Sequence, residues 1–327
     1  MTEPSLAQDL AGVLRDPDPN ARQLALMELE DLSDPELVGP LIEAVKDEDP
    51  TVRALALGHL EDLGDPGAVP AVLGALEDRD AHVREVAATA LREFRGPEAA
   101  RHLIAAVAHP RPFVRASAVV ALRELRDGRA VAPLEGALGD PEPEVRREVV
   151  LALAYLRRPE TAPALRARLR DPDAGVRQVA VGALEAVGAL VEPALVDEVV
   201  ALLSDPDWRV RVEAAIVLGR AEHGRAAPAL QRALDDGAWQ VRKESALALG
   251  RLRAAAAAPD LVGMLASDTP DLRKAAAQAL GELRAAAAAA PLRGLLDDTD
   301  VEVRKAAARA LEAIQTGAGR HETLARN

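Results

Sequence analysis

Arginine recurs along this chain at a nearly fixed spacing, and a guanidinium group can bind a phosphate or a carboxylate through two parallel hydrogen bonds. The interval is 31 residues throughout, except for 34 residues between Arg177 and Arg211. The positions are Arg22, Arg53, Arg84, Arg115, Arg146, Arg177, Arg211, Arg242, Arg273 and Arg304. Guanidinium groups in such a register could bind a row of phosphates, or they could hold the protein itself together.

Carboxylates share this spacing and favour the structural role. Aspartate stands six residues before the arginine in every repeat except two, where His109 and Ser267 replace it. A guanidinium so placed can hydrogen-bond carboxylates and turn carbonyls, within one repeat or between neighbouring repeats. We therefore predict that these residues, called ladder arginines below, form a structural ladder.

The histidines show no pattern typical of a metal site. No two of them are three or four residues apart: His59, His82, His102, His109, His223 and His321. Cysteine is absent, which excludes disulfides, cysteine–metal ligation and a cysteine nucleophile. The sequence also lacks a glycine-rich phosphate loop and a nucleophile elbow. We therefore expect no catalytic residue, no metal and no cofactor.

A cluster of arginines interrupts a column that is apolar in the other repeats. Nine residues before the ladder arginine, the fifth repeat carries Arg168, with Arg166 and Arg170 two residues to either side. Carboxylates that could pair with Arg168 are Glu135, Glu160 and Asp171. Either Arg168 extends to solvent and pairs there, or the three arginines form a basic site for an acidic peptide or anion. Glu135 and the three arginines are therefore candidate partner-binding residues.

Two tryptophans occupy the same position in adjacent repeats. Trp208 and Trp239 each stand three residues before a ladder arginine. They could cover the turn before a helix, or they could anchor a partner protein as half-exposed aromatic side chains.

Glycine concentrates in one column, ten residues before the ladder arginine. The column contains Gly12, Gly74, Gly136, Gly263 and Gly294. Glycine inside a helix costs about 1 kcal/mol, so a reason is needed for the enrichment. We interpret it as close helix packing, with close approach of a partner as the alternative.

The residues around each ladder arginine predict two helices per repeat. Leucine follows every ladder arginine by seven residues, and apolar residues three and four after it complete one helix face. Asp18-Pro19, Asp49-Pro50 and Asp207-Trp208 place a capping residue before the first helical position. We call this helix the arginine helix. An intervening helix follows a turn such as residues 64–66, for example over residues 68–76.

This pair of helices resembles a HEAT repeat, and more narrowly the short bacterial HEAT-like repeats first named from the phycobilisome lyases. The motif reads D-x-D-x-x-V-R-x-x-A-x-x-A-L-x-x-L in the arginine helix, then x-A-V-P-x-L-x-x-A-L. It covers about residues 5–327. The resemblance implies an all-α solenoid in which the arginines are structural, whereas the family's functions span scaffolds, lyases and hydroxylases.

Two enzymatic relatives within this resemblance are poorly matched. The deoxyhypusine hydroxylases carry several His-Glu dipeptides, but this chain has only His321-Glu322. A tetrapyrrole site needs aromatic walls, and the sequence has one Tyr, two Phe and two Trp. A phycobilin-lyase-like or other enzyme-associated role is therefore the alternative rather than the main interpretation.

Charge and hydropathy restrict the possible partners. The net charge is −13, and such an acidic chain is poorly suited to the phosphate backbone of nucleic acids. Residues 1–64 contain 15 acidic and four basic residues, a balance of −11 that could form a soluble cap or a docking surface for a basic partner. Neither a signal peptide nor a transmembrane segment is predicted, so we expect a soluble, cytoplasmic protein.

The sequence as a whole predicts an α-α superhelix, a right-handed HEAT-like solenoid of about 20 helices spanning residues 1–327 as one domain. We expect a half unit over residues 5–14, repeats over about residues 16–316, and a tail over residues 317–327. Arginine helices are expected outside and intervening helices inside, on the concave face. The predicted function is a non-catalytic scaffold or adaptor that holds a protein or peptide there. Nucleic-acid binding is a third option, disfavoured by charge.

Overall fold

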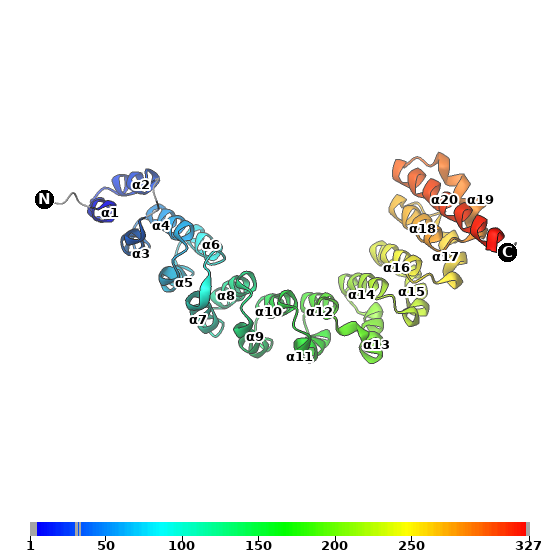
Figure 1. Ribbon diagram of the computed structural model, residues 1–327, viewed down its shortest axis with the longest axis horizontal. Coiled ribbons are helices and arrows are strands. Elements are labelled where there is room, and N and C mark those ends of the chain that lie inside the picture. Colours follow the sequence, from blue (N-terminus) through cyan, green and yellow to red (C-terminus); the bar gives the residue numbers. More distant parts are fainter. Residues whose placement is uncertain (1–4, 30–31, 33, 325–327) are drawn as a thin grey trace. The chain divides into compact units, whose positions relative to one another are not determined.

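The computed structural model describes residues 5–29, 32 and 34–324, with side chains described as far as Thr316. In this part of the chain the structure contains 20 α-helices, short 3-10 turns and no strand. Figure 1 shows the helices following one another in antiparallel pairs. The prediction of an all-α repeat protein with about 20 helices is confirmed.

Arginine helices and intervening helices alternate along the chain. The arginine helices are α2 (Pro19–Met27), α4 (Pro50–Leu63), α6 (Ala81–Ala90), α8 (Pro112–Leu125), α10 (Pro143–Leu156), α12 (Ala174–Ala186), α14 (Trp208–Arg220), α16 (Trp239–Arg251), α18 (Pro270–Glu282) and α20 (Val301–Leu324). The intervening helices are α1 (Leu6–Val13), α3 (Val38–Ala44), α5 (Val69–Ala75), α7 (Gly96–Ala106), α9 (Val131–Ala137), α11 (Ala162–Ala167), α13 (Pro193–Ala201), α15 (Ala227–Arg232), α17 (Ala258–Met264) and α19 (Ala289–Gly294).

The predicted caps begin the arginine helices. The Asp49 side chain accepts the backbone N–H groups of Thr51 and Val52, and Pro50 occupies the first helical position. Asp18 and Asp207 cap α2 and α14 through one N–H group each, that of Asn20 and that of Arg209. Because the capping carboxylate satisfies N–H groups that lack a partner inside the helix, it fixes where each arginine helix starts.

Two stretches depart from the regular repeat. The three-residue insertion before α13 forms a separate 3-10 turn, Ala189–Val191, followed by Glu192 in an extended conformation. The insertion therefore lengthens the turn between α12 and α13. At the C-terminal end we expected the repeats to end at about residue 316, with a tail over residues 317–327. Instead α20 continues as one helix to Leu324. No proline follows Ile314, and the cost of Gly317 and Gly319, about 1 kcal/mol each, does not end the helix.

The core of each repeat lies between its arginine helix and the intervening helices. The leucine seven residues after the ladder arginine is fully buried in the eight internal repeats, from Leu60 to Leu280. The equivalent Leu29 and Leu311, in the first and last repeats, are only partly buried. This difference is expected in a solenoid, where each repeat is covered only by its neighbours.

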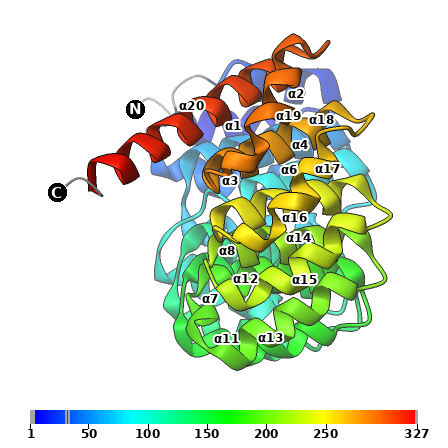
Figure 2. The ribbon, with the colours of Figure 1, turned by 90° about the vertical axis from the view of Figure 1, so that its right-hand side faces the viewer.

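The chain divides into two compact units, Met1–Ala164 and Leu165–Asn327, which are described separately. Within each unit the arginine helices form one row and the intervening helices another (Figure 1). Figure 2 shows the second unit with α14, α16 and α18 stacked in successive layers.

Within each unit the row of arginine helices lies on the inner side of the curve (Figure 1). The expectation that these helices lie outside is wrong. The physical reason is clearest in the second unit, where small residues let successive arginine helices approach to backbone contact. The row that packs more closely forms the inside of a curved stack.

Candidate functional site

The ladder arginines link consecutive turns within each unit. Arg53 donates from Nη1 to the backbone carbonyl of Asp47, 2.8 Å away, in the turn before its own helix. Its Nε and Nη2 donate to the two carboxylate oxygens of Asp78 in the next such turn, both at 2.7 Å. The same bidentate pairing, with N···O distances of 2.6–2.8 Å, joins Arg115 to Asp140, Arg177 to Asp205, Arg211 to Asp236 and Arg273 to Asp298.

The paired aspartates also shape their own turns. Oδ1 of Asp298 accepts the backbone N–H of Asp300 at 2.8 Å. Hydrogen bonds from Arg273 above all hold the pKa of Asp298 below its ordinary value. In four other ladder carboxylates burial favours a higher pKa, but hydrogen bonds from arginine and backbone outweigh it and the pKa is lowered. These four are Asp78, Asp140, Asp205 and Asp236.

The ladder has a gap at each of the two positions where aspartate is replaced. His109 Nδ1 accepts the backbone N–H of Arg111, and Ser267 Oγ accepts that of Thr269, both at 3.2 Å. The turn is therefore still capped. The arginine of the preceding repeat, however, makes no ion pair with any described carboxylate. Arg84 and Arg242 donate only to carbonyls of their own turns.

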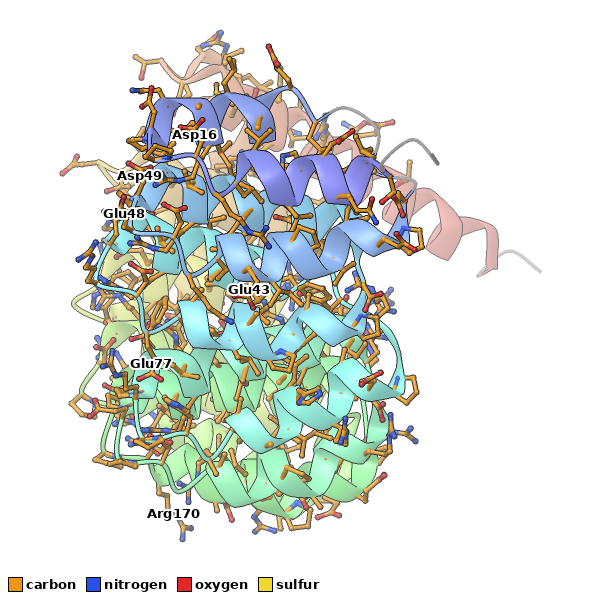
Figure 3. The ribbon with its side chains drawn as sticks, turned by 90° about the vertical axis from the view of Figure 1, so that its left-hand side faces the viewer. Asp16, Glu43, Glu48, Asp49, Glu77 and Arg170 are labelled. Carbon is orange, nitrogen blue, oxygen red and sulfur yellow. The ribbon has the colours of Figure 1, made fainter. Side chains whose placement is uncertain are left out.

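The structure gives the arginine cluster around Arg168 partners among nearby carboxylates. Arg166 donates from Nε to Glu198 on α13 at 3.1 Å, and Arg170 lies 3.9 Å from the same carboxylate. Arg168 is 3.6 Å from Asp171, one of the three partners considered from the sequence. Arg170 projects into solvent (Figure 3), with 81% of its side chain exposed. The cluster lies on α11 and the following turn, in the row of intervening helices, and Glu198 offsets part of its charge. Glu135 lies on α9 in the first unit.

Both tryptophans stand at the first residue of an arginine helix, Trp208 on α14 and Trp239 on α16. The Arg209 guanidinium lies over the Trp208 ring, 4.9 Å from its centroid. The Trp239 side chain is 38% exposed. Neither residue lines the groove described below.

The predicted close packing at the glycine column is wrong. A Cβ atom built on any of these glycines meets nothing within 4 Å: Gly12, Gly74, Gly136, Gly263 and Gly294. They lie on the intervening helices, on a face that the neighbouring helices leave open.

Close packing occurs instead at glycines of the arginine helices in the second unit. A Cβ on Gly219 would lie 2.8 Å from the Cα of Ala248 on the next arginine helix. A Cβ on Gly250 would lie 2.8 Å from the Cα of Ala279, and one on Gly281 would lie 2.9 Å from the Cα of Ala310. Since real Cβ atoms do not approach backbone this closely, only glycine permits these helix contacts.

A groove of about 730 Å³ runs along α16, α18 and α20, in the row of arginine helices of the second unit. Its small residues are Gly250, Gly281, Ala306, Ala310 and Ala313. Its cations are Arg251, Arg253, Lys274, Arg284, Lys305 and Arg309. Its carboxylates are Glu222, Glu282 and Glu302. Cations thus outnumber carboxylates in the groove, although the whole chain has a net charge of −13.

The three carboxylates leave much of this positive charge unpaired. Glu302 is 2.8 Å from Lys305 and 3.9 Å from Lys274. Burial raises the pKa of Glu282, and the charge of Arg251 opposes that rise. Among the described side chains, no carboxylate lies within ion-pair distance of Arg253, Arg284 or Arg309. The arrangement can therefore attract an anionic group into a groove with a floor of small residues.

The sequence matches the family model of HEAT repeats over residues 7–78, 43–123, 102–185, 131–200, 196–281 and 264–325. The chain belongs to the HEAT-repeat family. The resemblance identified from the repeated motif is therefore confirmed at the level of the HEAT repeat.

Solved structures show where this HEAT-repeat fold recurs. A mutant of Kap121p matches with a TM-score of 0.69 and 16% identity, over 98% of this chain and 44% of that protein. Kap95p, in a complex with RanGDP, matches with a TM-score of 0.59 and 13% identity, over 94% of this chain and 56% of Kap95p. These similarities concern the fold alone. None of the curated proteins matches the sequence.

A third solved structure is an enzyme. Human deoxyhypusine hydroxylase matches with 27% identity over 79% of this HEAT-repeat chain and 99% of the enzyme, but with a TM-score of 0.36. A superposition that poor carries no argument about the site. Within the described side chains, no three histidine or acidic residues are grouped so that they could hold a metal ion. The side chains of His321 and Glu322 lie outside the described residues.

No helix in the described ranges of the chain is both long enough and apolar enough to cross a membrane.

Sequence reasoning missed the groove, although two columns carried the signal. Glycine stands eight residues after the ladder arginine at Gly219, Gly250 and Gly281, and alanine stands six after it in the next repeat. That these two columns face each other follows only from the register between neighbouring arginine helices, which the structure supplies.

Proposed function

We propose that this HEAT-repeat protein is a non-catalytic scaffold that binds a segment of another protein in the groove along α16, α18 and α20. The groove carries the proposal because it combines a floor of small residues with a rim of cations that lack carboxylate partners. Small residues let a peptide backbone approach closely, and charges at the rim orient it. The groove, rather than the cluster around Arg168, is favoured because Glu198 already pairs with Arg166 and lies near Arg170.

The fold supports a protein partner. Kap95p, which has a similar fold, binds RanGDP, so a HEAT solenoid can hold another protein along its helices. The earlier candidates Trp208, Trp239 and Glu135 remain predictions of secondary contacts, since none of them lines the groove.

Finer assignments from the sequence belong to the same proposal. The 31-residue spacing supports the short bacterial repeat type, and a cytoplasmic location remains a prediction. The phycobilin-lyase-like alternative is disfavoured because no aromatic side chain appears among the described residues that line the groove. Incubation with a bilin should therefore leave its absorption spectrum unchanged.

A paired affinity capture tests the scaffold proposal. Tagged wild-type protein and an Ala313→Arg variant, whose long side chain would block the groove, are incubated with the same host extract. Captured proteins are then compared by mass spectrometry. At least one protein should be captured by the wild type and lost with the variant, while the two have equal melting temperatures. If Ala313→Arg captures the same set as the wild type, the groove is not the binding surface.

A further inference from the structure

Beside the close glycine contacts of the second unit, the missing side chain of each glycine leaves a small space. In two successive repeats a long side chain from the next arginine helix covers this space. Over Gly219 lies Arg251, whose Nη1 is 3.6 Å from the position of a Cβ on that glycine. Over Gly250 lies Glu282, whose Oε2 is 2.8 Å from the corresponding position. In both cases the covering residue comes 32 positions after the glycine. A charged side chain from the next arginine helix therefore occupies each of these two hollows.

The third glycine, Gly281, has no long side chain at the equivalent position. The residue 32 positions after Gly281 is Ala313, and its methyl group is too short to reach over the glycine. The three atoms nearest to a Cβ on Gly281 all belong to Ala310. Gly281, Ala310 and Ala313 all line the groove of about 730 Å³. The groove therefore includes the place where the repeated pattern leaves a long side chain out.

The charges around Gly281 favour a negatively charged group in the space over it. Lys274, Arg284, Lys305 and Arg309 line the groove on α18 and α20 or just beyond α18. Glu302 already holds Lys305 at 2.8 Å, whereas no described carboxylate pairs with Arg284 or Arg309. Both arginines are exposed, and a guanidinium binds a carboxylate through two parallel hydrogen bonds.

We propose that the hollow over Gly281 is a seat for the carboxylate side chain of an acidic segment in a partner protein. A partner glutamate would lie over Gly281 as Glu282 lies over Gly250, with its charge between Arg284 and Arg309. This inference rests on the proposed scaffold function and adds the chemistry of the bound segment. An acidic peptide fits better than nucleic acid, because in this structure a glutamate carboxylate, that of Glu282, already lies over the equivalent Gly250.

A short fluorescent peptide of alternating glutamate and serine is the probe, and its lysine–serine counterpart is the control. Fluorescence anisotropy with the full chain should show binding of the glutamate peptide, weakened by added salt, and no binding of the lysine peptide. The variant Ala313→Glu supplies the missing side chain from within the protein. It should weaken binding of the glutamate peptide about tenfold or more.

Two further variants separate charge from bulk. Ala313→Gln has nearly the same size without the charge and should weaken binding less than Ala313→Glu. Arg170→Glu changes a charge in the row of intervening helices and should leave binding within about twofold. Equal melting temperatures show that each variant is folded. Unchanged affinity for Ala313→Glu, or equal loss for Ala313→Gln and Ala313→Glu, would overturn the proposed carboxylate seat.

Three other outcomes would also contradict the proposal that an acidic segment of a partner protein binds in the groove. Absence of binding by the glutamate peptide overturns the inference, as does tighter binding of a single-stranded oligonucleotide at equal charge. Self-association of the wild type that Ala313→Glu abolishes, measured by sedimentation, would make a second copy of this chain the occupant.

The capture experiment distinguishes this inference from the scaffold proposal. Partners that are lost with Ala313→Arg but are not displaced by the glutamate peptide would leave the scaffold proposal intact and overturn only the carboxylate seat.

Discussion

The two units share the arginine ladder but fill their inner rows differently. In the first unit, Arg123 stands eight residues after a ladder arginine and reaches Glu148 on the next arginine helix, with an N···O distance of 3.3 Å. In three successive repeats of the second unit the same position is Gly219, Gly250 and Gly281, and there the helix backbones touch. The ladder fixes the turns at one end of each helix. The distance between helices is then set by the volume of the side chains between them.

This difference explains why the candidate site lies in the second unit. In the first unit Arg123 fills the space between α8 and α10, whereas three successive glycines of the second unit leave room that a side chain from the next arginine helix can cover or leave open. Charge is also distributed unequally. Residues 1–64 carry −11 of the total −13, which leaves −2 for the rest of the chain. In the first unit, Asp16, Glu48 and Asp49 lie at the turns before arginine helices (Figure 3).

Acid should weaken the arginine–aspartate ladder in both units. We expect this to be the largest effect, because all paired aspartates are protonated together. Their pKa values are lowered in the folded state, so they stabilise the fold fully above their unfolded pKa of about 3.9. That stabilisation is lost as the pH falls through the lower folded-state pKa values. The melting temperature, followed by circular dichroism, should fall steeply only below about pH 4.

Carboxylates with raised pKa values act in the opposite direction. Burial raises the pKa of Glu213 and Glu282, so their protonation in mild acid favours the folded state. A melting temperature that already falls between neutral pH and about pH 5 would show that the ladder does not control the acid response.

Removal of one ladder arginine should have the next largest effect, equal in the two units. Arg53→Ala and Arg211→Ala each leave a largely buried aspartate, Asp78 or Asp236, without its cation. We expect each to lower the unfolding free energy of its unit by about 3 kcal/mol, measured by urea denaturation. Arg84→Ala is the matched control, because no described carboxylate depends on Arg84, and its cost should be clearly smaller. Equal losses for Arg53→Ala and Arg84→Ala would mean that the bidentate pair contributes little.

Glycine substitutions test what is particular to the second unit. Gly250→Ala places a Cβ 2.8 Å from the backbone of Ala279, so the helices must separate at a cost of about 1–3 kcal/mol. Gly74→Ala introduces the same methyl group on an intervening helix, where nothing lies within 4 Å, and should stabilise by about 0.5–1 kcal/mol. If both substitutions had the same sign, the close contact of α16 and α18 would not limit the second unit.

Features that depend only on the position of a residue within one repeat could be predicted from the sequence. The capping aspartates and the buried leucines follow from spacing along a single helix, so they could be assigned without the structure. The inner row could not be assigned, because it depends on which columns of successive arginine helices face each other. Gly74 belongs to the glycine column for which close packing was predicted, yet it faces open space, whereas Gly250 makes the close contact.

The arginine cluster illustrates the same limit. Arg168 interrupts an apolar column, and the sequence correctly included Asp171 among its possible partners. Glu198, the carboxylate that binds Arg166, lies 32 residues away on the next intervening helix. Such contacts between repeats need the register of the stack, which is a property of the packed helices rather than of one motif.

An aspartate at a gap in the ladder should have the smallest effect on stability. It tests most directly whether both units use the same ladder. Ser267→Asp keeps an oxygen that caps the turn and adds a second one, so Arg242 gains the bidentate partner that Arg211 and Arg273 already have. We expect a gain of about 1 kcal/mol in unfolding free energy, and Ser267→Asn, which lacks the charge, should give less. The gain should vanish when Arg242 is replaced by alanine, since a double-mutant cycle isolates the pair.

The corresponding change in the first unit, His109→Asp, should give a smaller gain for a reason that the structure provides. His109 Nε2 lies 3.4 Å from Glu77 Oε1, so an aspartate at this position would replace a favourable neighbour of Glu77 with a like charge. Because Arg111 also holds Glu77, with an N···O distance of 2.6 Å, the repulsion should reduce the gain without reversing it. A larger gain for His109→Asp than for Ser267→Asp would show that Arg84 and Arg242 are not equivalent gaps in one shared ladder.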